Sequence, residues 1–340
     1  MENNSDILLE VKGLKTHFTT DEGVVKAVDG VDFTVPRGLT LGVVGESGCG
    51  KSVTAYSILK LVTKPGKIVE GEIILRDRNN NLVDLAQLDE YSPEMRRIRG
   101  DAIAMIFQEP MNSLSPVHTI GNQIMEGILL HRDVNKAEAR RQAIDILRLV
   151  GMPNAEARID AYTFQLSGGM RQRAMIAMAL ACNPMLLIAD EPTTALDVTT
   201  QAQILELMKS LQQQLGMAVM LITHDLGVVA EVCDEVVVMY LGEVVEQASV
   251  DDLFYDPLHP YTKALLRSIP RLGYGHEQQL NPIEGSIPDP YNRPNGCPFH
   301  DRCDVMIPGV CDVIHPDLIR MPDGRTVRCV LYKDQAQENA

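Results

Sequence analysis

A glycine-rich octet constrains most strongly what this chain can fold into. Gly45-Glu46-Ser47-Gly48-Cys49-Gly50-Lys51-Ser52 fits the pattern G-x-x-x-x-G-K-[ST]. The segment 39–44 before it is mostly apolar, as in a buried strand, and residues 52–62 after it have helical spacing. Glycines allow backbone N–H groups to converge on phosphate oxygens at the positive end of a helix. Lys51 can reach the β- and γ-phosphates and the Ser52 hydroxyl can ligate Mg²⁺, so the octet predicts a nucleotide phosphate site.

Two apolar strands joined by a helix place this loop in an α/β fold. Segments 185–189 and 217–222 have the composition of buried strands, and residues 200–215 between them have helical spacing. A strand, helix, strand order implies a parallel sheet with right-handed crossovers. Cys49 within the loop is interpreted as a small tolerated residue rather than a redox switch.

The regions on either side of this core have different characters. Three short antiparallel strands are expected at 8–12, 24–28 and 31–35, separated by turns at 21–23 and 29–30. Residues 115–165 are helical in pattern, and Asn135 followed by Glu138 has the spacing of an N-capping box. Proline density rises after about residue 250, which indicates a loop-rich appendage.

The apolar strand expected at 185–189 ends in two carboxylates. Asp190 and Glu191 follow an apolar run, and consecutive strand residues point to opposite faces. The two side chains can therefore divide the work. Asp190 is expected to hold the Mg²⁺ shell, and Glu191 to orient or deprotonate an attacking water.

Charge and hydropathy exclude several classes of protein. The chain has 31 Lys and Arg against 46 Asp and Glu, a net charge of −15, which argues against a main role in gripping nucleic acid. The longest unbroken apolar run found, 174–182, is too short for a membrane span, which needs about 20 residues. The first residues do not have the pattern of a secretory signal. A cytoplasmic protein with reduced thiols is expected.

Further motifs, in a fixed order, resemble those of ATP-binding-cassette (ABC) ATPases. Leu166-Ser167-Gly168-Gly169-Met170 is similar to the signature motif of that superfamily. Gln108, in Ile106-Phe107-Gln108-Glu109-Pro110, matches the Q-loop, and Ala195-Leu196-Asp197 matches the D-loop. His224 matches the switch histidine, and Phe18 stands where the family keeps an aromatic residue that stacks on adenine.

The resemblance implies a P-loop ATPase with a small antiparallel subdomain and a helical subdomain. Two such subunits are expected to close head to tail, so that each nucleotide lies between the phosphate loop of one and the signature of the other. The expected catalytic residues are Glu191, His224, Gln108 and Lys51. ATP and Mg²⁺ would be bound by Phe18, Gly45, Glu46, Ser47, Gly48, Cys49, Gly50, Lys51, Ser52, Val53, Gln108, Asp190, Glu191 and His224. Ser167, Gly168, Gly169 and Asp197 would act on the partner's nucleotide.

A finer resemblance covers nearly the whole chain. Segments 168–180 and 189–199, with His259-Pro260-Tyr261-Thr262, resemble the ATPase subunits of bacterial dipeptide and oligopeptide importers. Met170 suggests the D-type of a D/F pair that works beside a second, Gln-bearing ATPase. The resemblance implies two transmembrane permeases, an extracytoplasmic binding protein, no nucleic acid, and a peripheral place on the cytoplasmic face of the membrane. Importers for glutathione, nickel complexes or sugars are an alternative, and a DNA-maintenance ABC ATPase is a weaker one.

Four of the seven cysteines fall in the last 44 residues, at Cys297, Cys303, Cys311 and Cys329. Their spacing matches neither a zinc pattern with a tight pair nor the common iron–sulfur patterns. Taken alone, it leaves open a soft-metal site, inert thiols or disulfides. The resemblance to importer ATPases, on Pro294-Asn295-Gly296-Cys297 and the three later cysteines, implies a [4Fe-4S] cluster, with Zn²⁺ as the alternative.

The expected domain division follows from these motifs. Residues 1–114 and 166–250 would form the ATPase core with its N-terminal antiparallel subdomain. Residues 115–165 would form the helical subdomain that ends at the signature. Residues 251–340 would form an importer-type extension with the four-cysteine site.

Overall fold

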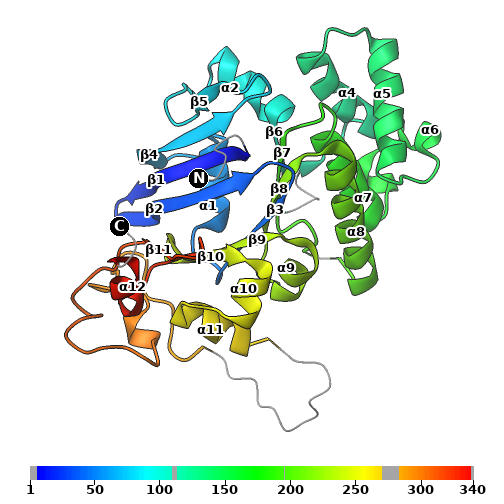
Figure 1. Cartoon of the computed structure of the whole chain (residues 1–340). Helices are drawn as coiled ribbons and strands as arrows, with labels where there is room; N and C mark the ends of the chain where they lie inside the picture. The colour runs from blue at the N-terminus through cyan, green and yellow to red at the C-terminus, as the bar shows by residue number, and fades with distance from the viewer. Residues whose placement is uncertain (1–5, 109–112, 195, 270–282, 338–340) are drawn as a thin grey trace. The chain divides into compact units, whose positions relative to one another are not determined.

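The computed structural model describes residues 6–108, 113–194, 196–269 and 283–337 (Figure 1). The chain divides into two compact units. The first comprises residues 1–9, 35–40 and 74–222, and the second comprises 10–34, 41–73 and 223–340.

Parallel strands buried on both faces form the sheet of the first unit. They are β6 (Ile103–Ile106), β7 (Leu186–Asp190) and β8 (Ala218–Ile222), in the order β8-β7-β6. Ile188 pairs with Met105 on one side and with Met220 on the other, both in parallel register. Every residue of β7 and β8 is buried. The parallel pairing confirms the prediction from strand, helix and strand order, with α8 (Val198–Leu215) as the connecting helix.

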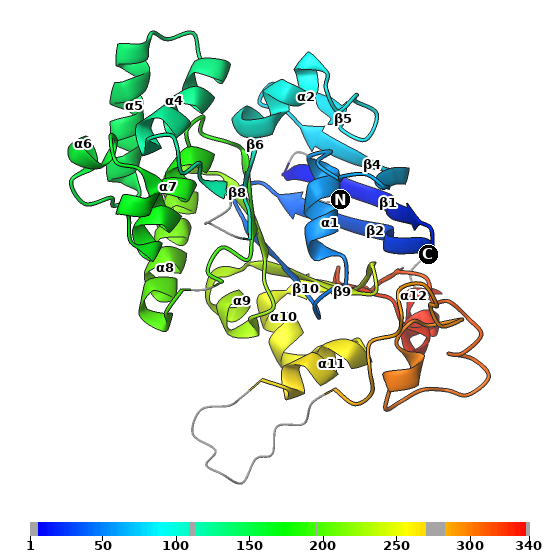
Figure 2. The ribbon, with the colours of Figure 1, turned by 180° about the vertical axis from the view of Figure 1, so that it is seen from behind.

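The remainder of the first unit contains several further helices (Figures 1 and 2). They are α2 (Pro93–Arg97), η1 (Ile98–Ala102), α4 (Ile120–His131), α5 (Lys136–Leu149), α6 (Ala155–Arg158), η2 (Thr163–Gln165) and α7 (Gly168–Ala179). Helix α5 begins as predicted, because the Asn135 side chain accepts the Glu138 N–H over 3.0 Å. Its buried stripe of Ala139, Ala143 and Leu147 lies on the face that packs against α4 and α7.

Long antiparallel strands open the second unit. They are β1 (Ile7–Thr20), β2 (Gly23–Pro36) and β4 (Gly66–Arg76), in the order β2-β1-β4, and the end of β4 pairs with β5 (Leu82–Asp84) in the first unit. The turn predicted at 21–23 is present between β1 and β2 at residues 21–22, and Gly23 already begins β2. The predicted turn at 29–30 is wrong, because Asp29 and Gly30 lie inside β2. Gly30 has φ +83°, so the strand accommodates there a backbone conformation that would otherwise mark a turn.

A mixed sheet forms the other layer of the second unit. Its strands are β3 (Thr40–Val44), β9 (Glu235–Tyr240), β10 (Glu243–Ser249), β12 (Thr326–Val327) and β11 (Ile319–Arg320), in the order β11-β12-β10-β9-β3. Strands β3 and β9 are parallel, with Val43 opposite Val237, and the other neighbours are antiparallel.

Short helices, joined by loops, accompany this sheet in the second unit. The helices are α1 (Lys51–Ile58), α9 (Leu226–Val232), α10 (Val250–Tyr255), α11 (Pro260–Arg267), η3 (His300–Arg302), η4 (Val330–Tyr332) and α12 (Lys333–Gln337). Helices α9 and α10 contact each other, and α10 also contacts β9 and β10. The loop-rich part predicted after about residue 250 begins later than expected, because α10 and α11 occupy much of 250–267; the described residues after Arg267 are mainly loop.

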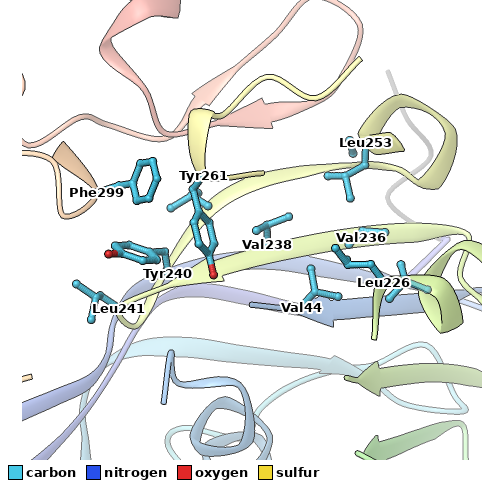
Figure 3. Close-up of a cluster of buried hydrophobic side chains, with 12 residues drawn as sticks. Val44, Leu226, Val236, Val238, Tyr240, Leu241, Leu253, Tyr261 and Phe299 are labelled. Carbon is cyan, nitrogen blue, oxygen red and sulfur yellow. The ribbon is translucent and has the colours of Figure 1, made fainter. Parts of the chain in front are cut away.

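A buried cluster joins the sheet of the second unit to its C-terminal loops. Val236 and Val238 of β9 pack with Leu226 of α9 and Leu253 of α10 (Figure 3). Tyr240, Tyr261 and Phe299 belong to the same cluster, and their ring centroids lie 4.6 to 5.3 Å apart. In the described part of the chain, no helix is both long and apolar enough to span a bilayer.

Candidate nucleotide-binding site

The glycine-rich octet lies between β3 and α1, as the sequence predicts. Gly45, Gly48 and Gly50 have φ values of +150°, +82° and +101°. A Cβ at Gly45 would lie 2.2 Å from the Met239 carbonyl oxygen, and one at Gly50 would lie 2.3 Å from that of Ala27. Both positions therefore require glycine. No side chain caps the N-terminus of α1, a terminus whose N–H groups suit an anion.

Lys51 lies over this loop. Its ammonium donates to the carbonyl oxygens of Gly45, at 2.7 Å, and Glu46, at 3.1 Å. Its Nζ is also 3.7 Å from the Cys49 sulfur. Cys49 is buried, and burial raises the pKa of its thiol. The cysteine is therefore a neutral packed side chain, in agreement with the interpretation that it is a tolerated small residue.

Two residues that sequence reasoning missed hold Glu46 of this loop. Arg302 donates two hydrogen bonds to the Glu46 carboxylate, at 2.8 and 3.0 Å. The Glu46 backbone N–H donates to the Tyr261 hydroxyl at 2.9 Å. Tyr261 belongs to the segment that resembles the importer extension, but no sequence signal pairs Arg302 with a residue 256 positions earlier.

Phe18 and His224 complete the candidate residues of the second unit. Phe18 is half-buried at the end of β1, and its ring packs over Gly66, where a Cβ would lie 2.5 Å from it. His224 is exposed and follows Thr223, whose N–H donates to the Val43 carbonyl oxygen at 3.2 Å. Val53 lies in the first turn of α1.

The first unit brings Gln108 and Glu191 into direct contact. Asp190, the last residue of β7, is fully buried. Glu191 follows it with φ +46°, an uncommon conformation for a residue with a side chain. The Gln108 amide donates to the Glu191 carboxylate at 3.0 Å, and the Thr194 hydroxyl donates to the same oxygen at 3.0 Å. Glu109 and Pro110 of the predicted Q-loop lie outside the described residues.

The signature residues begin helix α7. Ser167 is its N-cap and accepts the Met170 N–H, and Gly168 and Gly169 form the first turn. Asp197 caps α8 by accepting the Thr200 N–H at 2.9 Å and the Thr200 hydroxyl at 2.7 Å. Hydrogen bonds from the Thr200 backbone N–H and, second in size of effect, from the Thr200 side chain lower the pKa of the Asp197 carboxyl. Ala195 of the predicted D-loop lies outside the described residues.

The four late cysteines line one cavity. Cys297, Cys303, Cys311 and Cys329 share its walls with apolar groups such as Phe299, and all four are free thiols. Burial raises the pKa of Cys297 to about 12 and also raises the pKa of Cys303 and Cys329. Among the residues that the structure describes, no group of three or more His, Cys, Asp or Glu side chains is placed to hold a metal ion. The geometry of the described residues therefore supports neither the predicted [4Fe-4S] cluster nor the zinc alternative.

Comparison with known proteins places these features in context. A family model described as "ABC transporter" matches residues 28–194, and one described as "Oligopeptide/dipeptide transporter, C-terminal region" matches residues 245–311. The chain is 52% identical over 334 residues to the oligopeptide transport ATP-binding protein AppD of Bacillus subtilis, covering 98% of this chain and 99% of that protein. It is 46% identical over 329 residues to the dipeptide transport ATP-binding protein DppD of Escherichia coli, covering 97% and 98%.

A solved structure supports the same comparison. The dimeric post-hydrolysis state of the ATP-binding cassette MJ0796 bound to ADP and Pi matches with a TM-score of 0.62 and 28% identity. The match covers 72% of this chain and 99% of that one.

Proposed function

Because the chain belongs to the ATP-binding subunits of oligopeptide and dipeptide ABC transporters, we propose that its ATP hydrolysis powers the uptake of di- or oligopeptides by a bacterial importer. The observation that carries this proposal is the combination of two parts in one chain. A complete phosphate loop lies between β3 and α1, and the C-terminal region matches that of peptide transporters.

The loop and the two carboxylates supply the chemistry of the proposal. Lys51 and the backbone amides of the octet would bind the phosphates. Asp190 and the Ser52 hydroxyl would hold Mg²⁺, and both are hard oxygen donors of the type that this ion prefers. The buried position of Asp190 also fits a carboxylate that serves an ion rather than solvent. Mg²⁺ would neutralise charge on the phosphates.

Glu191 would orient and deprotonate the attacking water, with Gln108 holding its carboxylate in place. His224 would contact the γ-phosphate, and Phe18 would stack on adenine. Ser167, Gly168, Gly169 and Asp197 would serve the nucleotide of a second subunit. This role is supported by the position of Gly168 and Gly169 in the N-terminal turn of α7, where an anion is favourable.

The proposed assembly contains several other subunits. A second, F-type ATPase would complete a heterodimer, two permeases would carry the peptide, and an extracytoplasmic protein would deliver it. The chain would lie at the cytoplasmic face of the membrane, attached through the permeases. Residues 1–114 and 166–250 would act as the ATPase core, 115–165 as the helical subdomain and 251–340 as the extension. Family membership argues against the DNA-maintenance alternative.

The four late cysteines are proposed to hold a [4Fe-4S] cluster. Support comes from the four cysteines lining one cavity, although no three His, Cys, Asp or Glu side chains of the described residues are placed to hold a metal ion.

Reconstitution tests the proposed transport function. The chain would be expressed together with the permeases and second ATPase encoded by neighbouring genes, and the complex inserted into vesicles with the binding protein. We expect ATP-dependent accumulation of a labelled dipeptide or short oligopeptide. Accumulation of glutathione, a nickel complex or a sugar in place of peptide would show that the importer transports that class of substrate instead. Failure to associate with any membrane protein would reject the importer.

A further inference from the structure

An acidic side chain stands inside the loop that is proposed to bind phosphate. Glu46 occupies the second position of the octet, and its side chain is 23% exposed. A carboxylate beside an anionic triphosphate is repelled by it, and the repulsion grows where water is partly excluded. The consensus pattern does not require a carboxylate at this position. The loop therefore needs a cation that balances Glu46.

Arg302 supplies that cation. Its Nη1 donates to Oε2 of Glu46 at 2.8 Å and its Nη2 donates to Oε1 at 3.0 Å. This two-pronged geometry is the strong form of an arginine–carboxylate pair. The Arg302 side chain is only 4% exposed, and the hydrogen bonds to Glu46 raise its pKa above the usual value. The guanidinium is thus charged at every physiological pH.

Groups from β9 and from the C-terminal region fix the guanidinium from several sides. Its Nε donates to the Glu284 carbonyl oxygen at 3.1 Å, and its Nη1 donates to the Tyr240 hydroxyl at 3.3 Å. The guanidinium carbon lies 5.9 Å from the ring centroids of both Tyr240 and Phe299. A cation held in this way loses little freedom when it pairs with Glu46.

Tyr261 attaches the loop at a second point. The Glu46 backbone N–H donates to the Tyr261 hydroxyl at 2.9 Å. Tyr261 is fully buried between Tyr240 and Phe299 in the cluster shown in Figure 3. The Glu46 amide is therefore directed at the protein, while its carbonyl oxygen accepts from Lys51. One residue of the loop is held through its amide, its carbonyl and its carboxylate.

We propose that Arg302 and Tyr261 are positioning residues for nucleotide binding. Arg302 neutralises Glu46, and the two residues together hold the loop backbone in its phosphate-binding form. This inference rests on the proposed phosphate-binding role of the octet. It gives the C-terminal region a role in nucleotide binding, because Arg302 and Tyr261 both lie in that region and both bind Glu46.

The test is a cycle of charge removals on the full chain. Arg302→Met keeps the apolar stem beside Phe299 and Tyr240 but removes the cation. It should weaken equilibrium binding of MgATP about tenfold, which corresponds to ~1.4 kcal/mol. Glu46→Gln alone should change affinity less than threefold. The double variant Arg302→Met/Glu46→Gln should regain affinity to within about threefold of the parent, because no unbalanced charge is left.

Rescue separates charge balance from a loss of packing. If the double variant binds MgATP as weakly as Arg302→Met, or if Arg302→Met binds normally, the proposal is overturned. Arg302→Lys keeps the positive charge but cannot form the two parallel hydrogen bonds, so its affinity for MgATP should be intermediate. This variant replaces Arg302→Met if Arg302→Met does not fold. Parental affinity of Arg302→Lys would then contradict the positioning role.

Two controls complete the experiment. Arg267→Met removes an exposed pair with Asp304, in which Nη1 and Oδ2 lie 3.0 Å apart, and should leave affinity unchanged. Lys51→Ala tests the octet separately. If Lys51→Ala binds MgATP normally, the phosphate-binding role fails. If only Lys51→Ala weakens binding, the octet role stands and the Arg302 inference fails.

Discussion

The side-chain amide of Gln108 donates a hydrogen bond to the Glu191 carboxylate across 3.0 Å. These residues lie 83 positions apart, after β6 and β7, two adjacent parallel strands of the first unit. Parallel strands deliver their carboxyl ends to the same edge of a sheet, which is why the two side chains meet. The contact leaves the carboxylate oriented by Gln108 and Thr194.

Glu191→Gln should abolish most ATP hydrolysis while preserving ATP binding. A glutamine has nearly the same shape but cannot accept a proton, and a general base contributes on the order of 100-fold or more to rate. Turnover would be measured by phosphate release from the reconstituted complex, and affinity by equilibrium binding of MgATP. Turnover above about a tenth of the parental rate would contradict the role of Glu191 as base.

Gln108→Ala should lower kcat by about tenfold with little change in thermal stability. The substitution removes the donor that orients Glu191, but Thr194 still donates to the same oxygen. A matched control is Gln142→Ala, which removes a comparable amide–carboxylate bond of 2.8 Å to Glu138 on helix α5. Equal kcat values for the two variants would show that the Gln108 contact does not serve hydrolysis.

Lys51→Ala should weaken binding of MgATP by about 10- to 100-fold. A hydrogen bond to a charged group contributes about 1.5–3 kcal/mol, and each 1.4 kcal/mol is a factor of ten. Lys67→Ala, at an exposed position in β4, is the control for the loss of one positive charge. Affinity is measured by isothermal titration, and equal affinity of both variants would argue against the phosphate cradle.

Local patterns in the sequence predict much of this fold and of its candidate site. The octet, strand β7, the Asn135 cap and the contact-forming residues Gln108 and Glu191 all carry signals within a few neighbouring residues or in the family motifs. The turn predicted at 29–30 failed because Gly30 takes a positive φ inside β2, and composition does not distinguish that case from a turn.

The pairing of Arg302 with Glu46 illustrates what local signals cannot give. An arginine in this part of the chain could in principle pair with many carboxylates. Only the folded cluster of Tyr240, Tyr261 and Phe299 places Arg302 beside the carboxylate of Glu46. The four cysteines illustrate the same limit. Their spacing left several kinds of site open, and only the fold shows that they line one cavity.

Stability should depend on pH through Glu246. Burial raises the pKa of this carboxyl above 4.5, against the opposing effect of hydrogen bonds from the Leu258 and His259 N–H groups at 2.7 and 2.8 Å. The folded state therefore binds a proton more readily than the unfolded state. The resulting stabilisation is full below about pH 4.5 and is lost as pH rises through the folded-state pKa, by at most about 1.4 kcal/mol per pH unit.

Glu246→Gln removes this proton while it keeps one acceptor oxygen for the backbone. The midpoint of urea unfolding would be followed between pH 4.5 and 8 by tyrosine fluorescence, which is usable because the chain has no Trp. The parental midpoint should fall more steeply with rising pH than that of Glu246→Gln. Glu22→Gln, at an exposed turn, should follow the parent. Identical curves for all three would exclude a pH effect of Glu246.

Cys297→Ser should remove most of the iron from protein purified without air. Serine is a poor ligand for a cluster that is held by thiolates, and one lost ligand breaks the four-point attachment. Iron content and visible absorbance are the measurements, with about four iron atoms expected per parental chain. Cys182→Ser is the matched control, since Cys182 is a buried free thiol of the first unit outside the four-cysteine cavity. Colourless, iron-free parental protein that is folded and hydrolyses ATP would reject the cluster, and stoichiometric zinc in its place would assign the cavity to the alternative metal.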